Sequence, residues 1–82
     1  MRNDWIVGRI AFLLRSTRNA ESNQRVDEEA YYLGGFLAGL LTAEVLTEQQ
    51  FDRLAKLKNN AASYRSSELL SAEVERLLGR AA

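Results

Sequence analysis

The chain has 82 residues, a formal net charge of zero, and no cysteine, histidine or proline. A chain of this length buries roughly 60–65% of its unfolded surface, so we expect one domain that spans residues 1–82. The lack of cysteine excludes disulfides and thiolate metal sites, and the lack of histidine removes the commonest general base and metal ligand. We therefore expect no enzyme activity, no cofactor, no bound metal and no small-molecule substrate.

The composition is typical of helices joined by short turns, because Ala, Leu, Glu, Gln, Arg and Lys dominate. We expect an all-α fold, a small bundle of four short helices at about 4–16, 26–44, 47–60 and 67–78. The uncharged run at residues 30–43 is shorter than the roughly 20 apolar residues that cross a membrane. Arg9 interrupts the apolar run near the N-terminus, and no signal-peptide cleavage site follows it. We expect a cytoplasmic protein with no membrane partner.

The predicted helix at 4–16 is apolar on two sides. At 100° per residue, one side carries the expected core stripe, which consists of Ile6, Val7, Ile10, Leu13 and Leu14. Trp5 and Phe12 fall together on nearly the opposite side. These two aromatic residues are either further core residues of a compact bundle or exposed anchors for a partner. The polar residues 16–25 should form either an exposed connection to the next helix or a frayed helix end.

The predicted helix at 26–44 should start near Val26 and Asp27. Its expected core face consists of Val26, Ala30, Leu33, Leu37, Leu40 and Leu41. The opposite side is nearly bare backbone, and its candidate self-association residues are Tyr32, Gly35, Gly39 and Ala43. Each helical glycine costs about 1 kcal/mol relative to alanine, and close approach of another helix would offset that cost. That helix belongs either to the same chain or to a second copy, and we favour a homodimer.

The last two predicted helices differ in the strength of their boundary signals. Thr47 and Gln50 have the spacing of a capping box, with Leu46 and Phe51 as a hydrophobic staple, so a helix should begin at 47. Asn59 and Asn60 favour an end near 60. Ser66 or Ser67 should cap a fourth helix that stops at Gly79. The expected buried stripe of this fourth helix consists of Leu69, Leu70, Val74, Leu77 and Leu78.

Charge is segregated along the chain. Residues 1–25 carry a net +3, residues 26–52 carry six acids and no base, and residues 53–65 carry four bases and no acid. Oppositely charged helices could lie beside one another, or the acidic stretch could meet a basic partner. The candidate partner contacts are Trp5, Phe12, Arg15, Glu28, Glu29, Glu48 and Asp52.

We expect a non-catalytic protein that acts through protein–protein interaction. It could be a regulator or inhibitor whose acidic residues 27–52 engage the basic, nucleic-acid-binding surface of a target. The alternative is a small dimeric DNA-binding regulator that uses the arginines of the predicted helix at 4–16. A helix-turn-helix with Gln49, Gln50 and Arg53 facing bases is disfavoured, because Glu48 and Asp52 would then lie near phosphates. A third option is a structural subunit of a larger assembly. No motif in the chain is specific enough to indicate a family.

Overall fold

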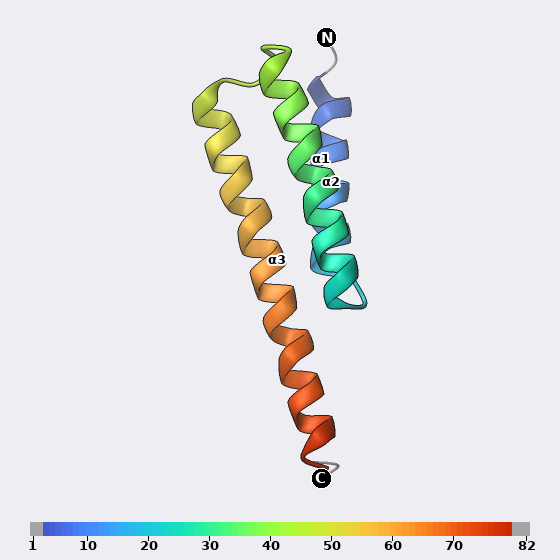
Figure 1. Cartoon of the computed structure of the whole chain (residues 1–82). Coiled ribbons are helices and arrows are strands. Elements are labelled where there is room, and N and C mark those ends of the chain that lie inside the picture. Colours follow the sequence, from blue (N-terminus) through green and yellow to red (C-terminus); the bar gives the residue numbers. More distant parts are fainter. Residues whose placement is uncertain (1–2, 80–82) are drawn as a thin grey trace.

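The computed structural model describes residues 3–79, which form three helices: α1 (Asn3–Arg18), α2 (Asn23–Thr42) and α3 (Glu48–Leu77). The first two helices form an antiparallel hairpin, and α3 runs along the hairpin and continues well past its closed end (Figure 1). The resulting shape is long and thin, with extents of 52 × 20 × 16 Å. The all-α prediction is confirmed, but the prediction of four helices is wrong, because the third and fourth are one helix.

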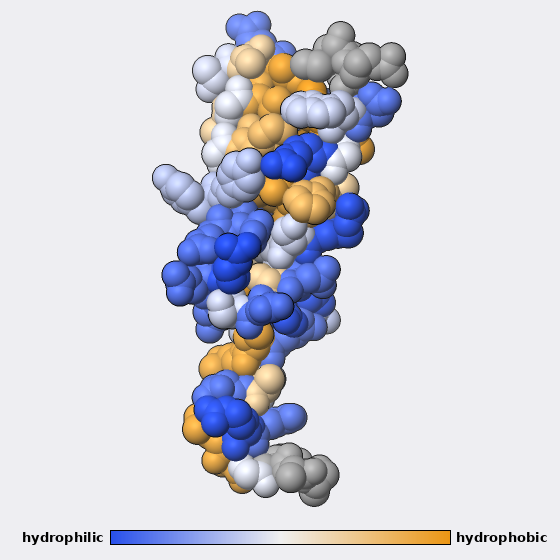
Figure 2. Space-filling view, turned by 90° about the vertical axis from the view of Figure 1, so that its right-hand side faces the viewer, coloured by the Kyte–Doolittle hydropathy of each residue, from blue (hydrophilic) through white to orange (hydrophobic). Residues whose placement is uncertain are grey.

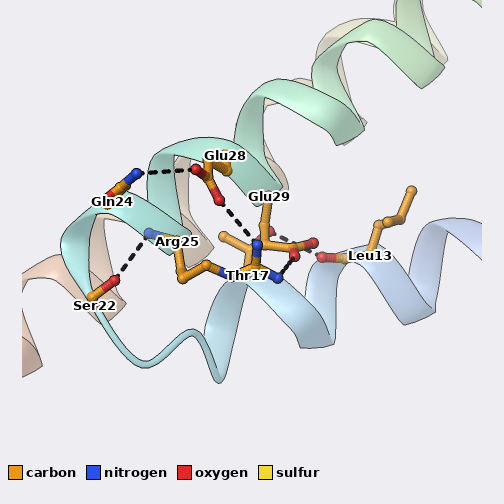
Figure 3. A network of polar contacts seen from close by, with 7 residues as sticks. All are labelled: Leu13, Thr17, Ser22, Gln24, Arg25, Glu28 and Glu29. Carbon is orange, nitrogen blue, oxygen red and sulfur yellow. Dashed lines mark hydrogen bonds and ion pairs between the residues drawn. The ribbon is translucent and has the colours of Figure 1, made fainter.

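The start of α2 lies earlier than predicted, at Asn23 rather than near Val26. Ser22 has an extended backbone, and its hydroxyl oxygen accepts a hydrogen bond from the Arg25 amide at 3.2 Å, which makes it the N-cap. Arg25 also forms ion pairs with Glu28 and Glu29, three and four residues further on (Figure 3). Such pairs stabilise the polar first turn of the helix, which has no apolar anchor before Val26.

A Schellman motif ends α2. The amide of Val45 donates to the carbonyl of Leu40 at 2.9 Å, and the amide of Glu44 donates to the carbonyl of Leu41 at 3.0 Å. This geometry requires a left-handed residue after the helix, and Glu44 occupies that position with a φ of 62°. Glycine is the usual residue there, because it has no Cβ to clash in this conformation.

The capping box that starts α3 is confirmed. The Gln50 amide donates to the Thr47 hydroxyl at 3.1 Å, and the Thr47 amide donates to the Gln50 side-chain oxygen at 2.9 Å. The other predicted boundary of this segment is wrong, because α3 passes through residues 59–67 without a break.

Asn and Ser do not stop α3 because neither is a strong helix breaker. Each costs less than about 0.7 kcal/mol relative to alanine inside a helix, and five of them spread over residues 59–67 do not outweigh continued backbone hydrogen bonding. The first glycine after Glu48 is Gly79, which has a φ of 68° just beyond the helix. The predicted stop at Gly79 is therefore confirmed.

The core lies between the α1–α2 hairpin and the first half of α3. Its buried cluster consists of Ile6, Ile10, Leu13, Leu33 and Leu37, against which Phe36, Phe51, Leu54 and other half-buried apolar residues pack. The predicted core stripes of α1 and α2 are buried or half-buried except for Val7, which is exposed. No residue of α3 is fully buried, so this helix rests on the hairpin rather than inside it.

The last part of α3 has no neighbour within the described chain. Every residue from Leu70 to Gly79 is exposed, and we call this segment the α3 overhang (Figure 1). The predicted buried stripe is therefore wrong for Leu70, Val74, Leu77 and Leu78, and only Leu69 is half-buried. The reason is that the closed end of the hairpin reaches only as far as Glu68, where Arg18 holds it.

Candidate functional site

Aromatic side chains and an arginine form a contiguous exposed surface over α1 and α2. The guanidinium carbon of Arg9 lies 5.5 Å from the ring centre of Phe12 and 5.9 Å from that of Tyr32. Arg9 also donates a hydrogen bond to the Tyr32 hydroxyl at 3.1 Å. Trp5 meets Phe36 edge to face, with ring centres 6.4 Å apart. We call these five residues the aromatic face.

The aromatic face is open to solvent. Trp5 is 63% exposed and Phe12 is 49% exposed, so their interpretation as residues of a compact core is wrong. In Figure 2, apolar and aromatic surface gathers over the hairpin, and a charged band separates it from a second apolar area on the α3 overhang. The cause is the number of helices, because within residues 3–79 α1 has only α2 and α3 as neighbours and keeps a free side.

Arg9 and Phe36 are the members of this surface that were not among the predicted contact residues. The Arg9 guanidinium holds two rings in place, one on its own helix and one on α2. The three-residue spacing from Arg9 to Phe12, which places both on one side of a helix, was the available signal. The position of Tyr32 opposite Arg9 depends on how the two helices pack, and periodicity does not give that.

A polar groove of about 600 Å³ lies at the closed end of the hairpin. Three predicted partner contacts, Phe12, Arg15 and Glu29, line this groove together with Arg25. Arg25 pairs with Glu29 at 2.7 Å and with Glu28 at 2.9 Å (Figure 3). In the same region the Thr17 hydroxyl is fully buried and donates to the Leu13 carbonyl at 3.0 Å (Figure 3). The groove shares Phe12 with the aromatic face and adds positively and negatively charged side chains beside it.

The predicted acidic contacts do not form one patch. Glu28 and Glu29 lie in the first turns of α2, whereas Glu48 and Asp52 lie in the first turns of α3. These two sites are at opposite ends of the hairpin, about 20 Å apart along α2. Arg25 offsets the charge of the first pair, so the geometry favours the aromatic face over the acidic stretch as a binding surface.

The predicted self-association face on α2 is uncovered. A Cβ added at Gly35 or Gly39 would meet nothing within 4 Å, and Tyr32 and Ala43 are exposed. Among the described residues, the only close approach to a helical glycine is the Lys58 side chain, 3.3 Å from a Cβ built at Gly34. No helix of the described chain therefore offsets the cost of Gly35 and Gly39, and their burial by a second copy stays a prediction.

Polar contacts hold the middle of α3 to the closed end of the hairpin. Arg18 binds both carboxylate oxygens of Glu68, at 2.7 and 3.2 Å, and Arg65 binds the same carboxylate at 3.1 Å. The hydrogen bonds from these two guanidinium groups lower the pKa of Glu68. Arg65 also donates to the Ala20 carbonyl at 2.7 Å, and the Arg18 guanidinium stacks over Tyr64. This arrangement is a structural clamp rather than a reactive site.

A second groove, of about 540 Å³, lies between α1 and the start of α3. Its walls are almost entirely apolar, with Ile6, Val7, Ile10 and Leu14 on one side and Leu54 on the other. Gln50 and Arg53 complete the α3 side. We call it the α1–α3 groove, and it lies on a different side of α1 from the aromatic face.

Neither a metal-binding cluster nor a membrane-spanning helix is found among the described residues. Within residues 3–79, no three acidic side chains are placed so that they could hold a metal ion. None of the helices in that range has the length and hydropathy to cross a membrane. Comparison of the chain with protein-family models, with curated proteins and with solved structures gives no match.

Proposed function

We propose that this protein is non-catalytic and acts by binding another protein, as small regulators and inhibitors do, and that the aromatic face is its binding surface. The observation that carries the proposal is the exposure of Trp5 and Phe12 on the same side of the hairpin as Arg9 and Tyr32. A small protein gains nothing for its own stability from aromatic rings left in water, since apolar area contributes only when it is removed from solvent.

The residue types support a protein partner. Trp, Tyr and Arg are the residues most enriched among those that dominate binding energy at protein interfaces. Arg9 is already ordered between two rings, so less side-chain entropy is lost on binding. The charged groove with Arg15 and Glu29 beside the rings resembles the polar rim that surrounds an apolar interface centre.

A photo-crosslinking experiment tests the proposal. A benzophenone amino acid replaces Phe12 in cells that produce the protein naturally, and the matched control carries it at Asp27, an exposed residue on the far side of α2. We expect a crosslinked protein of defined mass from position 12 and none from position 27. Trp5→Ala should remove the crosslink without changing the circular dichroism spectrum.

The affinity of the identified partner gives the second measurement. Loss of a dominant interface residue costs at least about 2 kcal/mol, so Trp5→Ala should weaken binding roughly 30-fold or more. Equal crosslinking from both positions, or full affinity in Trp5→Ala, would overturn the proposal. Crosslinking to a second copy of this chain alone would also overturn it, because the aromatic face would then be a self-association surface.

A further inference from the structure

Two apolar surfaces at opposite ends of α3 have no occupant within the described chain. The α1–α3 groove lies beside Gln50, Arg53 and Leu54 in the first turns of the helix. The α3 overhang carries exposed Leu70, Val74, Leu77 and Leu78 in its last turns. Because α3 is a continuous helix, its own overhang cannot fold back to reach its own groove.

We propose that two copies of this chain associate through antiparallel α3 helices, so that the overhang of each copy fills the α1–α3 groove of the other. A register that places Val74 beside Gln50 of the second copy has its two-fold axis at Ala62, the middle of α3. Both ends are then occupied at once, as symmetry requires of an isologous dimer. No residue of the aromatic face takes part, so this inference does not rest on the proposed function.

The sequence of α3 provides a seam that joins the two surfaces. Gln50, Leu57, Tyr64, Ser71 and Leu78 recur at seven-residue spacing, and the position three residues later in that heptad holds Arg53, Asn60, Ser67 and Val74. Leu57 and Tyr64 are exposed in the middle of the helix, which continues the apolar seam between the groove and the overhang. Two such helices would supercoil to keep the seam in contact along their length.

Charge favours the antiparallel direction. The charged side chains of residues 53–65 are all basic, whereas Glu68, Glu73 and Glu75 outnumber Arg76 in residues 66–77 and Glu48 and Asp52 begin the helix. In the proposed register Glu68 of one α3 lies opposite Lys56 of the other, whereas Glu73 and Glu75 lie opposite the uncharged Phe51 and Gln49. A parallel pair would instead align like charges, which opposes association.

The length of helix in contact favours this arrangement over a dimer in which only the two overhangs pair. A stable interface buries about 800 Å² on each partner, and the overhang is a helix only about 15 Å long. Overhang-to-overhang pairing would also bring the same acids together. The proposed pair uses the whole of α3, about 45 Å, together with a preformed groove at each end.

The oligomeric mass gives the first test. We expect sedimentation of the wild-type chain at submillimolar concentration to show twice the 9.2 kDa chain mass. The combined variant Leu70→Gln, Val74→Gln and Leu77→Gln should weaken dimerisation more than tenfold, and it should fold because these side chains are exposed in the single chain. The matched control on the outer side of the overhang, Ala72→Gln, Glu73→Gln and Arg76→Gln, should remain dimeric.

The mass measurement can overturn the proposal in three ways. A wild-type chain that remains monomeric would exclude it. A dimer that survives the overhang substitutions would place the contact elsewhere. A dimer that Gly39→Leu abolishes and the overhang variant retains would assign the contact to the glycine side of α2.

A distance measurement tests the register independently of any loss of association. The chain lacks cysteine, so Glu75→Cys gives a single spin-labelling site. The proposed register separates the two labels of a dimer by 26 residues of helical rise, about 40 Å. Overhang-to-overhang pairing centred on Val74 would bring them within about 15 Å, and that result would overturn the proposed arrangement.

Discussion

Replacement of Glu44 by glycine should stabilise the protein. Glu44 follows α2 with a φ of 62°, and its amide and that of Val45 donate to the carbonyls of Leu41 and Leu40. Those two hydrogen bonds fix the left-handed conformation, so the chain cannot relax away from it without losing them. The glutamate side chain is exposed, so its removal disrupts no packing.

The size of the effect follows from two opposing contributions. The left-handed region costs a residue with a Cβ roughly 1–2 kcal/mol, and glycine is free of that cost. Glycine loses more backbone entropy on folding, and this cost reduces the gain in stability by about 0.5–1 kcal/mol. The net gain is about 0.5–1 kcal/mol, which corresponds to a rise in melting temperature of about 2–8 °C for a chain of this size.

Urea denaturation measures this difference, with helicity followed by circular dichroism and the surroundings of the single tryptophan by fluorescence. The control is Glu44→Ala, which removes the same charge and keeps the Cβ strain, and it should match the wild type within about 0.5 kcal/mol. All three proteins are compared at one concentration, because self-association shifts apparent stability. If Glu44→Gly were no more stable than Glu44→Ala, the strain argument would be refuted.

Three further substitutions test the core, the cap and the clamp. Leu33→Ala removes a side chain with 0% exposure and should lower the free energy of unfolding by about 2–5 kcal/mol, measured by urea denaturation. Thr47→Ala should cost about 1 kcal/mol through loss of the α3 capping box, seen as a lower melting temperature. Glu68→Gln should lower the melting temperature at neutral pH. Because the pKa of Glu68 is lowered in the folded state, this difference should be complete above the unfolded pKa and vanish as pH falls through the folded one.

The core and cap substitutions have matched controls. Tyr31→Ala, at an 86% exposed position, should change the unfolding free energy by less than about 0.5 kcal/mol. Thr47→Ser keeps the capping oxygen and should retain the wild-type melting temperature. A Glu68→Gln difference that stayed constant down to pH 3 would show that the carboxylate charge is not what binds Arg18 and Arg65. An unchanged stability in Leu33→Ala would contradict the placement of the core.

The all-α fold and the buried faces of α1 and α2 were predictable from the sequence, because apolar residues at helical spacing lie on one face of a helix. Leu33 and Leu37 recur at core spacing and are buried, and Thr47 with Gln50 forms the predicted cap. The missed boundaries have a shared cause. Ser22 starts a helix in a polar stretch without an apolar marker, and Asn59 lies inside a helix whose total stability outweighs its weak local preference.

The binding surfaces were only partly predictable. The sequence places Trp5 and Phe12 on the second side of α1, and the same pattern is compatible with burial in a larger bundle. The exposure of these two side chains depends on how many helices surround α1. The described chain has three helices instead of the predicted four, because the third and fourth predicted helices are one. The α1–α3 groove depends on the gap between two helices that are distant in sequence, and no local pattern in either helix reports it.

The overhang gives α3 two different stabilities within one unbroken helix. The Arg18 and Arg65 contacts to Glu68 hold the helix to the hairpin, whereas the amides of residues 70–77 are held only by the helix itself. An isolated helical segment of this length is marginal in water, so in a single copy these amides should exchange with deuterium through local fraying. Amides in residues 51–66 should exchange only when the whole protein unfolds. A partner bound to the overhang would slow the exchange of the amides of residues 70–77 toward the rate of residues 51–66. Deuterium uptake at each of these amides therefore reports whether the overhang is covered.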